Sequence, residues 1–273
     1  MNNSMIGAMV TMASVQKRLD TIADNVANVN TTGYKSKDAS FEDVLARVQQ
    51  QPETYRQAGR AAPLGFNLGF GVKATGISAD MKQGSLQETG NPTDLAIEGN
   101  ALFAVEVNGQ KAWTRDGSFS FTPDPLGTGM LLTTSEGHAV LDRDGIPVTA
   151  PIGSKVAIDR QGNLLVRDNG TGTPYVAHQL QFVEPQRPEG LAQGPDNTFV
   201  LSAGVTEDDV FGQGAATVVP ATSAIRQGYL EQSNVDLTDE MTEMMQIQRM
   251  FQMASRALTS SDTMMGLANS LRA

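Results

Sequence analysis

The chain has 273 residues and a mass of 29.0 kDa, with 20 basic and 30 acidic residues and a formal net charge of −10. This acidic balance argues against binding to nucleic acid, which needs clustered lysine and arginine. The absence of cysteine excludes disulfides, thiolate metal sites and cysteine nucleophiles. Apolar residues make up 40% of the chain, which is enough to form a buried core.

Methionine is distributed unevenly. Of the 13 methionines, four lie in the first twelve residues and seven lie between residues 241 and 265. Only Met81 and Met130 remain for the long centre. The two ends of the chain therefore differ in composition from the middle.

The first segment has the apolar spacing of a helix with a heptad seam. The seam residues are Ala8, Met12, Val15, Leu19, Ile22, Val26 and Val29. Residues 28–33 end the pattern, and we expect Gly33 to act as a left-handed C-cap. The sequence therefore predicts one long N-terminal helix.

The last segment carries two apolar stripes at helical spacing. The first stripe is Met244, Ile247, Phe251, Ala254, Leu258, Ser261, Met265 and Ala268. The second stripe is Met250, Met253, Ala257, Ser260, Met264, Leu267 and Leu271. Because two stripes make a wide apolar surface, this helix is expected to have partners on more than one side. The end helices could pair with one another, with other copies, or both.

The centre changes to short strand-like runs separated by glycine turns every 8–12 residues, which predicts an antiparallel β domain. Hairpins are expected over residues 103–114, with a tight turn at Asn108-Gly109, and over residues 156–166. The predicted fold class is α+β, with discontinuous terminal helices of coiled-coil type and a mainly antiparallel β centre. The expected domains are a terminal helical assembly domain (1–35 and 226–273), an inter-domain arm (36–70) with a short helix over 41–48, and a β-rich outer domain (71–225).

No arrangement of residues argues for catalysis. His138 and His178 lack the spacing of a zinc site, and the Ser14-x-x-Lys17 pattern lies across the helical seam. Residues 142–145 fit a turn better than a calcium loop. We therefore expect no enzyme activity, cofactor, metal or small-molecule substrate. No apolar run approaches the ~20 residues of a membrane span, and the N-terminus lacks the pattern of a cleaved signal peptide.

Four blocks of sequence together resemble the bacterial flagellar axial proteins, the family of rod and hook subunits. The blocks are residues 19–35, residues 83–99 continued by 113–119, residues 228–236, and residues 248–251. The length fits the distal-rod type of member. The motif residues that carry the resemblance are Asn28, Asn30, Thr31, Thr32, Gly33, Asp94, Gly99, Arg115, Asp116, Gly117, Ser233, Asn234, Gln248 and Arg249.

The resemblance implies a structural subunit of the flagellar basal-body rod, whose terminal helices build a helical tube that transmits torque from motor to hook. Its implied partners are copies of itself, other rod and hook proteins, and the flagellar export apparatus. Its implied location is the basal body outside the cytoplasm, after export without signal cleavage. The expected assembly interface joins the N-terminal seam to Met244, Ile247, Phe251, Ala254, Leu258 and Met265. The alternatives are a non-flagellar structural or adhesin-like protein with coiled-coil ends, and an enzyme with an unrecognised site in the β domain.

Overall fold

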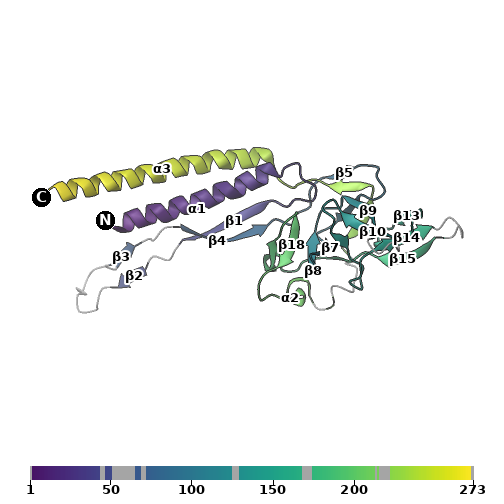
Figure 1. Cartoon of the computed structure of the whole chain (residues 1–273). Helices are drawn as coiled ribbons and strands as arrows, with labels where there is room; N and C mark the ends of the chain where they lie inside the picture. Colours follow the sequence, from purple (N-terminus) through teal and green to yellow (C-terminus); the bar gives the residue numbers. More distant parts are fainter. Residues whose placement is uncertain are drawn as a thin grey trace. The chain divides into compact units, whose positions relative to one another are not determined.

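The computed structural model describes residues 2–43, 47–50, 65–68, 72–124, 129–167, 174–212, 214 and 222–271. Contacts among residues divide the chain into two units, each built from separated segments (Figure 1). The helical unit comprises Met1–Val26, Lys37–Ile77 and Leu237–Ala273. The β unit comprises Ala27–Ser36 and Ser78–Asp236. The predicted α+β class, with helices at both chain ends and an antiparallel centre, is confirmed.

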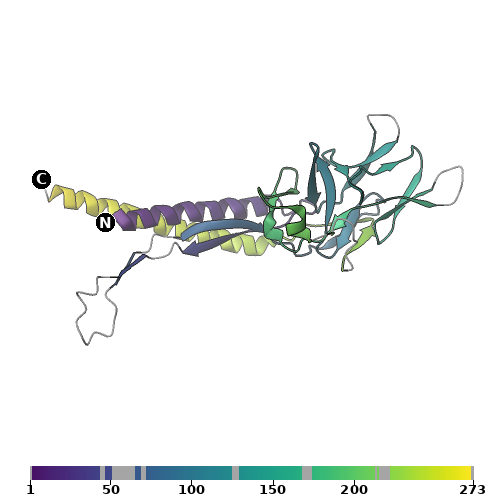
Figure 2. The same cartoon turned by 90° about the horizontal axis from the view of Figure 1, so that it is seen from below.

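Two long helices dominate the helical unit. Helix α1 runs over Asn2–Ala27 and helix α3 over Leu237–Ser270. Figures 1 and 2 show them side by side and antiparallel, with both chain ends at the same end of the pair. Asp239 and Glu240 lie in the first turn of α3, where negative charge complements the positive end of the helix dipole.

Short strands complete the helical unit. Strand β1 (Lys37–Asp43) pairs with β4 (Val72–Ala79), and β2 (Arg47–Gln50) pairs antiparallel with β3 (Gly65–Leu68). The short helix predicted over residues 41–48 is wrong, because the described parts of that range are strand. Pairing with a distant segment of the chain decided the local conformation there, which a local pattern does not reveal.

The segment after α1 also differs from its prediction. Helix α1 ends at Ala27, whereas Gly33, the expected C-cap, lies six residues further on and has a φ of 65°. A side chain at Gly33 would overlap the backbone of Arg115 and Asp116. Gly33 therefore serves a close approach of two backbones in the β unit.

The β unit is built from short strands with a 3₁₀ turn at Pro188–Gly190 and the short helix α2 at Glu207–Phe211. In chain order the strands are β5 (Leu86–Glu88), β6 (Leu95–Glu98), β7 (Leu102–Val107), β8 (Gln110–Thr114), β9 (Phe119–Pro123), β10 (Met130–Thr134), β11 (Ala139–Val140), β12 (Thr149–Ala150), β13 (Lys155–Ile158), β14 (Asn163–Arg167), β15 (Tyr175–Gln179), β16 (Phe182–Val183), β17 (Leu191–Gln193), β18 (Thr198–Leu201), β19 (Ala224–Gln227) and β20 (Tyr229–Glu231).

The largest sheet among the described residues has the strand order β12-β10-β11-β7-β8-β18-β17, with β16 pairing to β7 and β9 to β10. A separate three-stranded sheet has the order β13-β14-β15. Both predicted hairpins are confirmed: β7 pairs with β8, and β13 pairs with β14. Asn108 and Gly109 have φ angles of 53° and 77°, as a primed two-residue turn requires.

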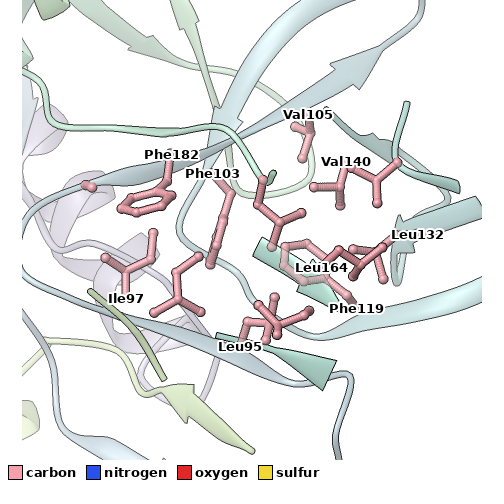
Figure 3. Close-up of a cluster of buried hydrophobic side chains, with 14 of the residues drawn as sticks. Leu95, Ile97, Phe103, Val105, Phe119, Leu132, Val140, Leu164 and Phe182 are labelled. Atoms are coloured by element: carbon pink, nitrogen blue, oxygen red, sulfur yellow. The ribbon is translucent and has the colours of Figure 1, made fainter. Parts of the chain in front are cut away.

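The core of the β unit is a cluster of buried apolar side chains from the largest sheet, the three-stranded sheet and the β6–β19 pair (Figure 3). Phe103 and Phe119 meet edge to face with ring centroids 5.2 Å apart. Phe103, Leu132 and Leu164 have no exposed surface. A second cluster surrounds Trp113, the only tryptophan in the sequence, which packs against Phe211.

The C-terminal strands close the β unit onto its first strands. Strand β19 pairs with β6, and β20 pairs with β5, so residues 224–231 lie against residues 86–98. The predicted domain boundary between residues 225 and 226 falls inside β19. The contact-defined β unit therefore includes both the segment that leaves α1 and the segment that leads to α3.

The core makes a direct prediction for stability. Replacement of the fully buried Phe103 by alanine (Phe103→Ala) removes its ring contacts and should lower the free energy of unfolding by about 3–5 kcal/mol. Urea titration followed by Trp113 fluorescence measures this, because Trp113 is itself buried in the β unit. Tyr175→Ala removes an aromatic ring that is 48% exposed and should change stability by no more than about 0.5 kcal/mol. Equal losses in the two variants would contradict the assigned core.

Candidate assembly interface

The helix pair has an apolar seam that the sequence predicted. Val15, Ile22 and Ile247 are buried together in the helical unit, and each is less than a tenth exposed. Leu19, Val26, Met244 and Phe251 pack against them while half-buried. Residues at spacings of three and four therefore face the partner helix, as a heptad pattern requires.

The other predicted interface residues have different positions. Ala8, Met12, Ala254 and Leu258 are half-buried on their helices, outside this buried cluster. Val29 follows the end of α1 and belongs to the β unit. The side chain of Met265 lies outside the described residues. The seam thus joins the two helices within one chain through the residues of this buried cluster.

The second stripe of α3 remains exposed in the single chain. Met250, Met253, Met264, Leu267 and Leu271 are between 42% and 89% exposed. Met241 and Met245 on the same helix are 52% and 54% exposed. A surface with this much exposed apolar side chain is typical of an interaction site, and methionine adapts to non-equivalent neighbours.

Polar contacts fix the register of the helix pair and its connection to β1. Arg18 of α1 forms an ion pair with Glu243 of α3. The buried Asn25 of α1 donates to Glu240 of α3 at 2.8 Å. The same amide accepts from the backbone N–H of Lys37 and donates to its carbonyl, both at 2.9 Å. Asn25 therefore links α1, α3 and the start of β1.

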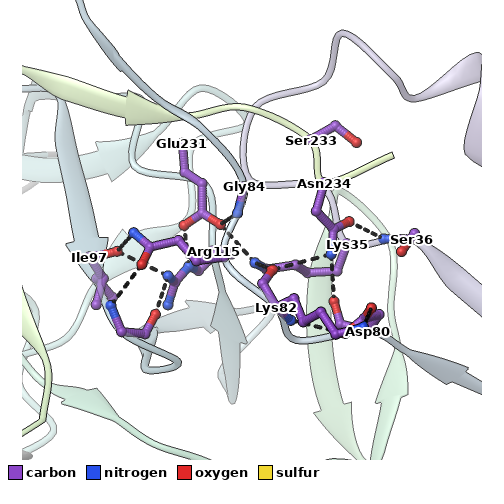
Figure 4. A network of polar contacts seen from close by, with 12 residues as sticks. Lys35, Ser36, Asp80, Lys82, Gly84, Ile97, Arg115, Glu231, Ser233 and Asn234 are labelled. Carbon is purple, nitrogen blue, oxygen red and sulfur yellow. Dashed lines mark hydrogen bonds and ion pairs between the residues drawn. The ribbon is translucent and has the colours of Figure 1, made fainter. Parts of the chain in front are cut away.

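A buried ionic cluster joins the segment that follows α1 to the segment that precedes α3, within the β unit (Figure 4). The Glu231 carboxylate accepts from the Lys35 ammonium at 2.7 Å and from Arg115 Nε at 2.5 Å. It also accepts from the backbone N–H of Gly84 at 2.8 Å. All three charged residues are no more than 3% exposed. One carboxylate thus neutralises two buried cations in part.

The Arg115 guanidinium also donates to three backbone carbonyls. It donates to the carbonyl of Ile97 at 2.9 Å and to those of Gly99 and Ala101. Gly99 adopts a φ of 109°, a conformation that favours glycine. Arg115 therefore holds the loop after β6 in place through fixed donor geometry.

Backbone contacts join the incoming and outgoing segments directly. The Gly33 N–H donates to the Glu231 carbonyl at 2.8 Å, and the Ser36 N–H donates to Asn234 Oδ1 at 2.7 Å. The Asn234 amide donates in turn to the Asp80 carbonyl at 2.9 Å. We call this set of contacts, together with the ionic cluster, the junction.

Burial weighs against the charged forms of the two cations in the junction. Removal from water lowers the pKa of Lys35 below its ordinary value; Arg115 adds to this effect, and Glu231 opposes it. Burial also lowers the pKa of Arg115, again opposed by Glu231. Both cations therefore depend on the one carboxylate between them.

Most of the motif residues serve turns and contacts of the β unit. Thr32 donates to Asp116 at 3.0 Å, and Asp116 accepts from the hydroxyl of Ser118. Asp94 accepts from Thr89 at 2.6 Å. The other contacts are Thr31 to Asn28, the Leu95 N–H to the Gly117 carbonyl, and the Val235 N–H to the Ser233 hydroxyl. Asn30 is exposed in the β unit, whereas Gln248 and Arg249 are exposed on α3.

Sequence patterns alone assign no role to three residues of these contacts, Lys35, Glu231 and Asn25. Each lies inside a block that carries the resemblance, but no spacing relates residue 35 to residue 231. Lys35 and Glu231 lie in polar segments beside the predicted helices, and Asn25 lies within one of these helices. Pairing of such charges becomes visible only when the topology brings the two segments together.

The described residues contain no group of three or more histidine, cysteine, aspartate or glutamate side chains placed to hold a metal ion. No helix in the described part of the chain is long and apolar enough to cross a membrane. His178 contacts Asp142 at 2.8 Å, and His138 contacts Asp196 at 3.2 Å.

Charge is separated between the two units. The helical unit has ten acidic and ten basic residues, whereas the β unit has twenty acidic and ten basic residues. The whole net charge of −10 therefore belongs to the β unit. A helical unit with balanced charge can pack against another without long-range repulsion from a net charge.

The fold, the seam and the exposed stripe together define a structural subunit with paired terminal helices. Family models match three segments: "Flagella basal body rod protein" over residues 8–35, "Flagellar hook protein FlgE/F/G D1 domain" over 96–166, and "Flagellar basal body rod FlgEFG protein C-terminal" over 226–271.

Full-length relatives agree with these matches. The chain is 33% identical to the flagellar hook-basal body complex protein FlhP of Bacillus subtilis over the full length of both. It is 33% identical to the basal-body rod protein FlgG of Borreliella burgdorferi, covering 96% of this chain and 95% of the relative. For FlgG of Bacillus subtilis the identity is 32% over 96% of each chain. The chain belongs to the flagellar basal-body rod and hook protein family, and it is a structural rod subunit of the flagellum.

The junction yields a second prediction. Glu231→Gln leaves Lys35 and Arg115 buried without their carboxylate, so the free energy of unfolding should fall by about 3–5 kcal/mol. Urea titration followed by Trp113 fluorescence measures the loss. Glu88→Gln is the matched control, because Glu88 is exposed on β5, in register with Tyr229, two residues before Glu231 on β20. A Glu231→Gln chain as stable as the control would show that the ion cluster contributes nothing.

Proposed function

We propose that the chain assembles with copies of itself through its helical unit, forming a helical tube that transmits torque from the motor to the hook. The observation that best supports this proposal is the exposed second apolar stripe of α3. The first stripe of the same helix packs against α1. Contacts between different surfaces of successive copies produce an open filament when the rotation from copy to copy does not close a ring.

In this proposal each unit has its own task. The helical unit packs against its neighbours, where its balanced charge permits close contact. The β unit carries the net negative charge, which favours solubility of the subunit before assembly. Other rod and hook proteins are proposed as neighbours at the ends of the tube, because the relatives are named as parts of the hook-basal body complex or its rod.

Export by the flagellar apparatus, without removal of the N-terminal segment, completes the proposal. A cleaved leader typically takes 15–30 residues. Such a cut in α1 would remove Val15 and could remove Ile22, which form the buried centre of the helix pair. We therefore place the mature subunit in the basal body outside the cytoplasm with α1 intact.

The assembly proposal is tested on the exposed stripe. Met253→Glu places a charge where a buried methionine would contribute about 1.5–3 kcal/mol. The protein concentration needed for assembly should rise at least about tenfold. Sedimentation velocity and electron microscopy over a concentration series measure this.

Gln252→Glu is the matched control, because it adds the same charge to the adjacent exposed position of α3. This variant should assemble like the parent chain. If both variants assemble as the parent does, the stripe is not the interface.

The export proposal has its own test. Mass spectrometry of the subunit from isolated basal bodies should detect peptides from residues 2–27. A mature chain that starts beyond Ile22 would overturn retention of α1.

A further inference from the structure

A half-satisfied carboxylate lies within the helix pair. Glu240, in the first turn of α3, accepts from the Asn25 amide of α1 through Oε1 at 2.8 Å. Its other oxygen, Oε2, is buried and has no hydrogen-bond partner among the described residues. A buried charged oxygen without a donor is unfavourable for the folded state.

The charges around Glu240 are mostly of the same sign. The cation that faces it from α1 is Arg18, which already pairs with Glu243 of α3. Asp38 of β1 lies 4.0 Å from the same guanidinium, which also donates to the Ala39 carbonyl at 3.3 Å. Three carboxylates therefore share one arginine.

The remaining cation on β1 does not relieve this imbalance. The Lys37 ammonium pairs with Asp24 at 3.0 Å. Burial raises the pKa of Glu240 above its ordinary value, with Glu243 and Asp38 adding to the shift. The hydrogen bond from Asn25 and the charge of Arg18 oppose it.

We propose that Glu240 makes the pairing of α1 with α3 proton-dependent, with the ionised carboxylate loosening the pair and the protonated form tightening it. Protonation removes the charge from the unpartnered oxygen and the repulsion from Glu243 and Asp38. An acid whose pKa is higher in the folded than in the unfolded state adds stability at low pH. That contribution is lost as the pH rises through the folded-state pKa.

The test is Glu240→Gln in the full chain, which keeps an acceptor for Asn25 and removes the charge. Melting is followed by circular dichroism at 222 nm, with Trp113 fluorescence recorded in parallel for the β unit. At pH 7.5 the helical midpoint of the variant should lie about 2–4 °C above that of the parent. This gain should disappear as the pH falls to 4, because the parent Glu240 then becomes neutral too.

Glu243→Gln is the matched control and should behave in the opposite way. It removes the partner of Arg18, so it should lower the midpoint at pH 7.5. A gain for Glu240→Gln that is the same at both pH values, or a loss at pH 7.5, would overturn the proposal. The measurement is made below the concentration of assembly, so its outcome is independent of the proposed tube.

Discussion

Two buried cations held by one carboxylate are the constraint on which the β unit depends. Lys35 follows α1, Arg115 lies after β8, and Glu231 ends β20, so three distant parts of the chain must meet before any of these charges is paired. Removing charged groups from water is costly, and a single unpaired member would leave that cost uncompensated. The fold of the β unit therefore depends on residues 33–36 and residues 231–234, which backbone and side-chain hydrogen bonds also hold together.

The helical ends and the β centre could be predicted from local patterns. The seam through Val15, Leu19 and Ile22 appears as a spacing of three and four residues, and the hairpin turn at Asn108-Gly109 depends on two adjacent residues. These features are encoded by neighbours in the chain, which explains why they could be recognised without a structure.

The features that prediction missed depend on partners far away in the sequence. Residues 41–48 were expected to be helical, yet their described parts are strands that pair with β4 and β3. Gly33 was assigned to the end of α1, whereas the backbone at Arg115 is the reason for its lack of a side chain. The same holds for Lys35 and Glu231, whose pairing is a property of topology and not of either segment.

The antiparallel pairing of α1 with α3 sets an order of events on the ribosome. Helix α1 is synthesised before α3, with residues 28–236 between them. The apolar seam of α1 therefore has no partner helix while residues 28–236 are synthesised. Because β19 and β20 also come late in the chain, the β unit cannot be completed before residues 224–231 are synthesised, and the helix pair cannot form before α3 is synthesised. An unfinished subunit therefore lacks both its helix pair and the closing strands of its β unit until these C-terminal segments are synthesised.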